Sequence, residues 1–202
     1  MESVYDGFVS RHLNRRISRP IARGLSHTPI TPNQVSVASL GVALGSFLCF
    51  FYGYYIIAAL LAQASSIVDG IDGDLARLKK MTSAFGGFMD SVLDRYADAL
   101  IILGLTLWAA GEDPRTYVWL AGFWALAGGF VVTYTRARIE NVPRTLFDRG
   151  VTSAASRDVR LLVVMVGALA GHGFATLIAL ACLTNVVVLL RLLYAGRVLK
   201  GV

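Results

Sequence analysis

The stretch SIVDGIDGDLARLKKMTSAFGGFMDSVLDR, residues 66–95, begins at the end of one apolar segment and continues into the next. An ionised side chain at membrane depth is costly, and it commonly marks a water-filled functional site. The role of these carboxylates therefore depends on whether the flanking segments cross a membrane. The stretch contains five aspartates: Asp69, Asp72, Asp74, Asp90 and Asp94.

The composition of the chain is that of a membrane protein. Its 202 residues are 55% hydrophobic and only 16% charged, whereas soluble domains contain about 25% charged residues. A spanning helix needs about 20 residues, so this length suits one domain of several spans. The two cysteines, Cys49 and Cys182, both lie in apolar runs, which predicts buried small side chains and no disulfide.

We expect an all-α integral membrane protein with six transmembrane helices and an N-terminal amphipathic interfacial helix. Within the N-terminal segment 1–30, residues 4–27 place apolar side chains at roughly helical spacing among arginines, which predicts a basic helix on an anionic membrane surface. The motif TPNQ, residues 31–34, predicts a capped helix start with proline in the first turn. The domain 31–202 then contains six apolar segments: 34–54, 56–77, 84–110, 115–140, 157–171 and 173–197.

The positive charges predict the orientation of these segments. With the N-terminus inside, 16 of the 19 Lys and Arg residues fall on the inner surface, the exceptions being Arg95, Arg115 and Arg191. This bias predicts a multi-pass protein of a prokaryotic cell or inner membrane, with both termini and the aspartate cluster on the cytoplasmic side. The net charge of +6 is thereby explained by membrane topology, and we expect no nucleic-acid partner.

Four of the aspartates form two pairs that share a helix face. Asp69 and Asp72 are three residues apart, and Asp90 and Asp94 are four apart. A short loop joins their segments, so both pairs are expected to converge near the cytoplasmic ends of adjacent helices. Converging carboxylates repel unless cations neutralise them, and an all-oxygen site suits Mg²⁺ or Mn²⁺. We expect one or two such ions, with two preferred.

Two further aspartates have simpler interpretations. Asp74 is expected to pair with a nearby basic residue such as Arg77, which could instead bind phosphate. Asp98 lies one helical turn deeper in the third segment, where it either pairs with Arg95 or Arg191 or forms part of the pocket.

Small residues stand beside the acids. Gly73 and Ala76 clear one face of the second segment, and Gly86 does the same at the start of the third. Such residues either let helices pack closely or leave room for a flat, phosphorylated ligand. The pair Gly128–Gly129 is expected to serve helix packing or dimer contact, and we expect a homodimer.

The spacing of these residues resembles the motif of the CDP-alcohol phosphotransferase family. Eight positions match: Asp69, Asp72, Gly73, Ala76, Arg77, Gly86, Asp90 and Asp94. The resemblance extends to the TPN motif and to the plan of six segments. It implies a membrane enzyme that moves a phosphate-containing group from a CDP-linked donor to a small alcohol acceptor and releases CMP.

The resemblance also implies a role for each matching residue. Asp69, Asp72 and Asp90 would be metal ligands. Asp90 and Asp94 would be the catalytic residues, and Asp94 would serve as a metal ligand, as the general base, or as both. The CDP moiety would contact Asp69 and the residues Gly73, Ala76, Arg77 and Gly86.

A second polar group defines a candidate acceptor site. SRDVR, residues 156–160, opens the fifth segment with Ser156 as the expected N-cap, and Arg138 ends the fourth segment within YTRARIE. Arg157, Arg160 and Arg138 could bind an acceptor phosphate, or the arginines could contact lipid headgroups. Both motifs resemble family branches that use phosphorylated acceptors: inositol phosphate or glycerol phosphate, with CDP-diacylglycerol or CDP-inositol as donor.

Two rival functions share the aspartate cluster. A divalent-cation transporter would use the acids as its transport site, but it leaves the Gly-x-x-Ala-Arg spacing unexplained. Membrane prenyltransferases also bind Mg²⁺ and a diphosphate, but they are longer and their acidic motifs lie farther apart.

Overall fold

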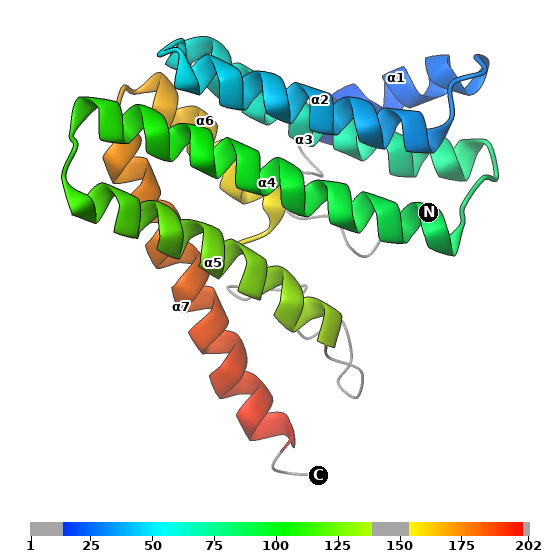
Figure 1. Cartoon of the computed structure of the whole chain (residues 1–202). Helices are drawn as coiled ribbons and strands as arrows, with labels where there is room; N and C mark the ends of the chain where they lie inside the picture. The colour runs from blue at the N-terminus through cyan, green and yellow to red at the C-terminus, as the bar shows by residue number, and fades with distance from the viewer. Residues whose placement is uncertain (1–13, 139–153, 200–202) are drawn as a thin grey trace.

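The computed structural model describes residues 14–138 and 154–199, and within these ranges every regular element is a helix. The last six helices begin and end within three residues of the six predicted apolar segments. The seven helices, shown in Figure 1, are α1 (Arg15–Ser26), α2 (Pro32–Phe51), α3 (Tyr55–Leu78), α4 (Ala84–Glu112), α5 (Thr116–Arg138), α6 (Arg157–Leu169) and α7 (Gly173–Leu199).

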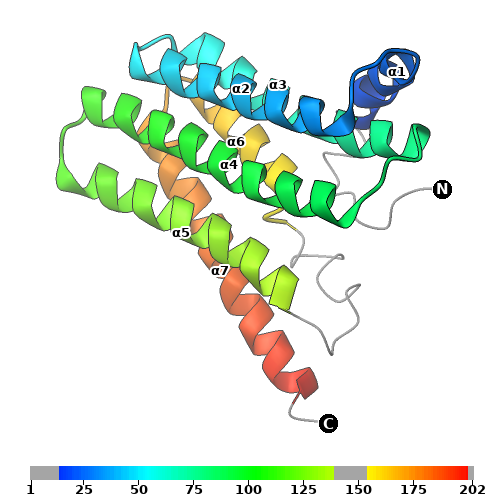
Figure 2. The same cartoon turned by 45° about the vertical axis from the view of Figure 1, so that its right-hand side comes forward.

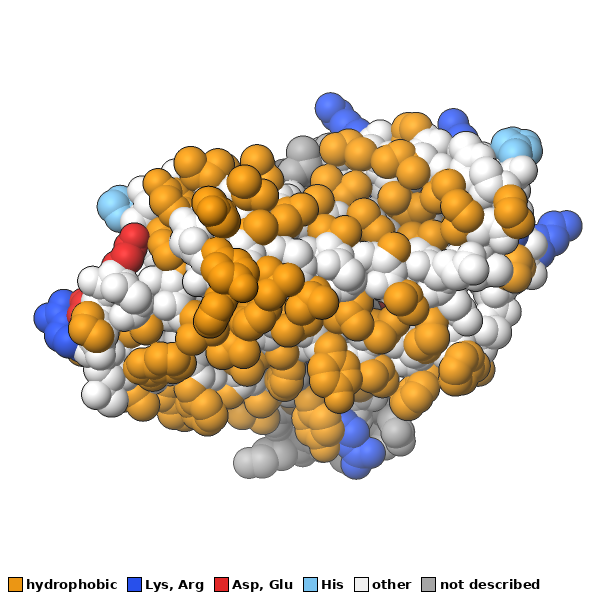
Figure 3. Space-filling view, turned by 45° about the horizontal axis from the view of Figure 1, so that its top comes forward, with side chains coloured by type: hydrophobic (Ala, Val, Ile, Leu, Met, Phe, Trp, Pro, Cys, Tyr) orange, Lys and Arg blue, Asp and Glu red, His pale blue; other side chains and the backbone are white. Residues whose placement is uncertain are grey.

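Four helices, α2, α3, α5 and α7, are long and apolar enough to cross a membrane. The other two predicted spans do not meet that criterion on their own: α4 carries several charged residues and α6 has 13 residues. Hydrophobic side chains cover most of the face in Figure 3, and charged side chains lie toward its ends and edges. The described residues thus form a multi-pass helical membrane protein.

The helices form two groups that meet at α4. α2 packs against α3 and α4, whereas α5 packs against α7, and α4 contacts both α5 and α7. α6 lies against α3 and α7, behind α4 in Figures 1 and 2. One buried cluster joins the two groups, and its largest fully buried side chains are Phe50, Ile101, Leu105, Leu177 and Leu180.

Local sequence signals fix the short connections between α2, α3 and α4. The predicted capping box is present, with Thr31 and Gln34 bonding each other's backbone N–H groups. Gly53 adopts a positive φ of 81° in the turn before α3, a conformation that glycine allows at low cost. Ser83 caps α4 by accepting a hydrogen bond from the Gly86 N–H. These short turns place the end of α3 beside the start of α4.

Glycines allow close helix contacts inside the chain. A Cβ atom added to Gly128 of α5 would lie 2.2 Å from Thr184 Oγ1 of α7. One added to Gly122 would lie 2.3 Å from Thr106 Oγ1 of α4. Gly128 therefore serves helix packing, one of the two roles predicted for it.

Helix α1 docks on α3 through one face. Ser18 and Ala22 are fully buried, and Ala22 packs against Ile71 and Leu75. The other face exposes Ile17 and Ile21 together with Arg16, Arg19 and Arg23. The helix is thus amphipathic, as predicted, while the apolar positions predicted for residues 1–13 lie outside the described residues.

Candidate active site

Three of the predicted acids converge from two helices. One carboxylate oxygen from each of Asp69, Asp72 and Asp90 lies within 4.8 Å of the other two. Asp72 is buried and the other two are half-buried, so water screens their mutual repulsion only in part. A set of hard carboxylate oxygens is the chemistry that Mg²⁺ and Mn²⁺ prefer. The residues present therefore fit the predicted metal ions.

A serine of α2 holds one of these carboxylates. The buried hydroxyl of Ser36 donates a hydrogen bond to Asp72 Oδ2. This contact fixes the carboxylate against α2 and links a third helix to the cluster. The sequence analysis missed Ser36, because a serine in an apolar helix carries no distinctive signal without its neighbours in space.

Arg157 links the start of α6 to the acids of α3 and α4. Its Nη1 atom lies 2.7 Å from Asp69 Oδ2 and 3.0 Å from Asp94 Oδ1. Its Nε atom donates to Asp98 Oδ1 at 3.2 Å. Asp94 thus joins the cluster through this guanidinium. Arg157 was predicted to bind either an acceptor phosphate or lipid headgroups, and the structure places it at the edge of the aspartate cluster.

Asp98 is a buried anchor for arginines. Its Oδ2 atom lies 2.5 Å from Arg160 Nη2 and 3.5 Å from Arg95 Nη2. Arg160 is also buried and donates to the Ala155 carbonyl oxygen at 2.8 Å. The expected pairing with Arg95 is confirmed, whereas Arg191 donates instead to the Val132 carbonyl oxygen.

The shortness of α6 explains how these arginines reach the acids. Its 13 residues extend about 20 Å at 1.5 Å per residue, less than the roughly 30 Å of a bilayer core. If its C-terminal end lies at one membrane surface, its N-terminal arginines lie within the membrane rather than at the opposite surface. Ser156 occupies the predicted N-cap position, although its side chain makes no capping hydrogen bond.

A cavity of about 180 Å³ opens beside the acids, between the start of α2, the end of α3 and the start of α4. A Cβ atom on Gly86 would lie 3.0 Å from Ser83 Oγ and 3.3 Å from Asn33 Oδ1, so glycine keeps this wall open. Six of the eight motif residues line the cavity: Asp72, Gly73, Ala76, Arg77, Gly86 and Asp90.

Arg77 and Asp74 form the expected ion pair on α3. Arg77 Nη2 lies 2.7 Å from Asp74 Oδ1, and Arg77 also lines the cavity. Arg15 of α1 approaches the same carboxylate, with Nη1 2.6 Å from Oδ1. The sequence analysis missed Arg15, since it is distant in sequence and no periodicity relates it to α3.

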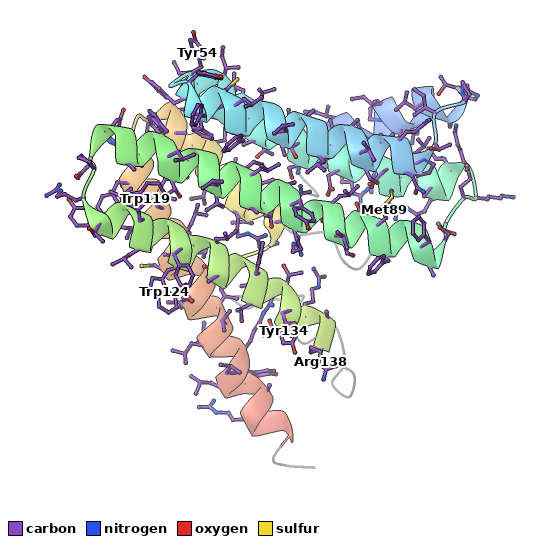
Figure 4. The ribbon with its side chains drawn as sticks, viewed as in Figure 1. Tyr54, Met89, Trp119, Trp124, Tyr134 and Arg138 are labelled. Atoms are coloured by element: carbon purple, nitrogen blue, oxygen red, sulfur yellow. The ribbon has the colours of Figure 1, made fainter. Side chains whose placement is uncertain are left out.

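Arg138, the third predicted acceptor residue, ends α5 with an exposed side chain, as Figure 4 shows. Arg157 and Arg160 instead face inward and pair with aspartates. The remainder of the YTRARIE motif, from position 139, lies outside the described residues.

Comparison with known proteins decides the family. A family model described as CDP-alcohol phosphatidyltransferase matches residues 29–190. The chain belongs to this family. Members of this family are transferases, and the match to a phosphatidyltransferase model favours neither a cation transporter nor a prenyltransferase.

Relatives within the family have related names. The chain is 47% identical over 193 residues to the "Bifunctional IPC transferase and DIPP synthase" of Rubrobacter xylanophilus, covering 95% of this chain but 43% of that protein. This chain therefore spans less than half the length of that relative. It is 33% identical to the "Archaetidylinositol phosphate synthase" of Methanothermobacter thermautotrophicus, covering 98% of this chain and 97% of that one.

A solved structure confirms the fold of the family. The apo phosphatidylinositol phosphate synthase of Mycobacterium tuberculosis aligns with a TM-score of 0.73 and 25% sequence identity, covering 88% of this chain and 95% of that chain.

Proposed function

We propose that this chain transfers a substituted phosphate group from a CDP-alcohol to the hydroxyl of an acceptor alcohol, releasing CMP. The observation that carries the proposal is the convergence of Asp69, Asp72 and Asp90 beside a cavity that is lined by two of them, by small residues and by Arg77. A nucleotide diphosphate needs both features: cation sites for its charge, and room for its base and sugar. The family membership supports the same reaction class.

The donor is proposed to bind in the cavity. Gly73, Ala76 and Gly86 admit the cytidine and diphosphate, and Arg77 contributes positive charge. Asp69, Asp72, Asp90 and Asp94 are the proposed ligands of two Mg²⁺ or Mn²⁺ ions, with Asp69 also contacting the donor. Bound there, such ions would offset the charge on the diphosphate and on the leaving CMP.

Asp94 is proposed as the general base as well as a ligand. It lies beside Arg157, at the boundary between the acids and the α6 arginines. The acceptor hydroxyl oxygen forms a bond to the phosphorus of the transferred group while the phosphorus–oxygen bond to CMP breaks. A carboxylate within hydrogen-bond reach can take the hydroxyl proton, and Asp94 contacts Arg157, one of the proposed acceptor-binding arginines.

We propose an acceptor that carries a phosphate of its own, with inositol phosphate preferred over glycerol phosphate. Arg157 and Arg160 lie near the N-terminal end of α6, a position that favours anions. Arg138 is proposed to contact the same phosphate from the end of α5. The archaetidylinositol phosphate synthase at 33% identity is named for an inositol phosphate product, which supports this acceptor.

The proposed setting is a six-span domain, residues 31–202, with both termini and the site on the cytoplasmic side. Helix α1, within residues 1–30, is proposed to lie at the interface, with its exposed arginines facing lipid headgroups. We further propose a homodimer.

A donor-by-acceptor panel tests the function. The purified full chain is incubated with Mg²⁺ or Mn²⁺ and with either CDP-diacylglycerol or CDP-inositol. Each donor is crossed with inositol phosphate, glycerol phosphate, inositol and serine, and CMP is measured. Release of CMP that depends on inositol phosphate supports the proposal. Absence of CMP release in every combination contradicts it.

A further inference from the structure

We propose that Asp74 and Arg15 are positioning residues that orient Arg77 over the diphosphate of the donor. This inference rests on the proposed function, because it assumes that a nucleotide diphosphate occupies the cavity. Neither residue belongs to the eight-position motif. Their role follows from the contacts that connect α1 to the cavity through one carboxylate.

The geometry is a chain of two ion pairs that share Asp74. Asp74 Oδ1 lies 2.6 Å from Arg15 Nη1, and Oδ2 accepts a longer hydrogen bond of 3.4 Å from Ser18. The same Oδ1 atom lies 2.7 Å from Arg77 Nη2. The Arg77 guanidinium also lies against the cavity wall, 3.7 Å from where a Cβ on Gly73 would be.

Burial distinguishes this arrangement from an ordinary surface pair. The side chains of Arg15 and Asp74 are 10% and 12% exposed, whereas that of Arg77 is 51% exposed. An isolated exposed pair three residues apart on a helix holds its side chains weakly. Here the carboxylate is fixed by a second helix, so it offers Arg77 a rigid anchor while the guanidinium stays open to the cavity.

Charge explains why two arginines share one carboxylate. If Asp74 paired with Arg77 alone, it would cancel the positive charge that a diphosphate needs. Because Arg15 also neutralises Asp74, the group of three keeps one net positive charge, carried by its most exposed member. A guanidinium held in a fixed orientation loses less conformational freedom on binding phosphate oxygens than a free one.

The proposal makes a prediction opposite in sign to simple electrostatics. Asp74→Asn removes a negative charge beside the cavity, which by attraction alone would tighten the binding of an anionic nucleotide. If Asp74 positions Arg77, the loss of this contact instead weakens nucleotide binding. Arg15→Gln removes the partner that neutralises Asp74, and it also weakens binding, although Arg15 does not line the cavity.

The test measures CDP binding to the purified full chain in the presence of Mg²⁺ by isothermal titration calorimetry. Asp74→Asn and Arg15→Gln are each expected to weaken binding about 3- to 10-fold, less than the loss of a charge-assisted contact to the ligand itself, because Arg77 remains. Arg15→Lys should restore most of the affinity. Arg16→Gln is the matched control, because Arg16 adjoins Arg15 but its side chain is exposed, and it should bind CDP like the wild type.

A double-mutant cycle separates positioning from a general loss of structure. In an Arg77→Ala background, Asp74→Asn and Arg15→Gln should cause no further loss of CDP affinity, because they act through Arg77. Equal or tighter CDP binding by Asp74→Asn, or an additive loss in the Arg77→Ala background, would overturn the positioning proposal alone. Failure of the wild-type chain to bind CDP would overturn the proposed function instead.

Discussion

Arg157 of α6 and Asp69 of α3 form an ion pair, with 2.7 Å between Nη1 and Oδ2. The pair joins two sets of residues that the sequence presents separately: the aspartate motif and the SRDVR segment. Arg157, a candidate ligand of the acceptor phosphate, therefore directly contacts Asp69 and Asp94, two candidate metal ligands. The predictions below follow from this arrangement.

The first prediction concerns the acids of the cluster. Asp69→Asn and Asp90→Asn keep the size of each side chain but remove a charged ligand. Loss of a ligand should lower CMP release by at least about 100-fold, more than is typical when a supporting contact of a metal site is lost. The assay is CMP release with the preferred donor and acceptor.

Asp113→Asn is the control for those variants, because Asp113 lies between α4 and α5, paired with Arg115. It should release CMP at the wild-type rate. Thermal unfolding in detergent should also show that the two cluster variants remain folded. Full activity in either cluster variant would contradict the assignment of that acid.

The second prediction concerns Arg157. Arg157→Gln removes the guanidinium that lies between the aspartate cluster and the proposed site of the acceptor phosphate. The KM for a phosphorylated acceptor should rise about 10-fold or more, as for loss of a charged hydrogen bond, while the KM for the donor changes less. Arg197→Gln, an exposed arginine near the end of α7, should change neither. A rise confined to the donor KM would contradict an acceptor role.

The third prediction compares two glycines of α4, one in the cavity lining and one outside it. Gly86→Ala would bring a methyl group within 3.0 Å of Ser83 Oγ and 3.3 Å of Asn33 Oδ1. These side chains line the cavity and must move, so CDP affinity should fall several-fold. At Gly111, near the other end of α4 and outside the cavity lining, a Cβ atom meets nothing within 4 Å, and Gly111→Ala should bind CDP normally. Equal affinities for both variants would show that Gly86 is not needed for an open cavity.

The fourth prediction concerns stability. Gly128→Ala would place a methyl group 2.2 Å from Thr184 Oγ1, a buried β-branched residue that has little room to rotate. Overpacking of this kind costs about 1–3 kcal/mol, so the thermal unfolding temperature should fall. Gly41→Ala is the control, because nothing lies within 4 Å of its added Cβ. A stable Gly128→Ala variant would indicate that α5 and α7 can separate at little cost.

The sequence predicted most of what depends on local order. Hydrophobic segments located six helices, and the TPNQ motif predicted the cap of α2. The spacing of Asp69 and Asp72 on one helix, with Asp90 on the next, predicted that these acids meet. These features follow from helical periodicity and from short loops that force neighbouring helices to be antiparallel.

Contacts between distant segments could not be predicted in the same way. Ser36, Arg15 and Arg157 reach the acids because of how α2, α1 and α6 pack on α3 and α4. Hydrophobicity fixes which segments are helices, but it leaves open which polar side chain meets which carboxylate. The sequence therefore offered Arg157 as a candidate ligand of the acceptor phosphate, but it did not predict the ion pair of Arg157 with Asp69.

The most direct test of the account is Mn²⁺ binding to the purified chain, followed by electron paramagnetic resonance. We predict that wild-type protein binds Mn²⁺ at the site formed by Asp69, Asp72 and Asp90, and that Asp72→Asn on α3 and Asp90→Asn on α4 each weaken binding about 100-fold. Mn²⁺ binding of wild-type strength in both variants would contradict the claim that acids from two helices share one metal centre.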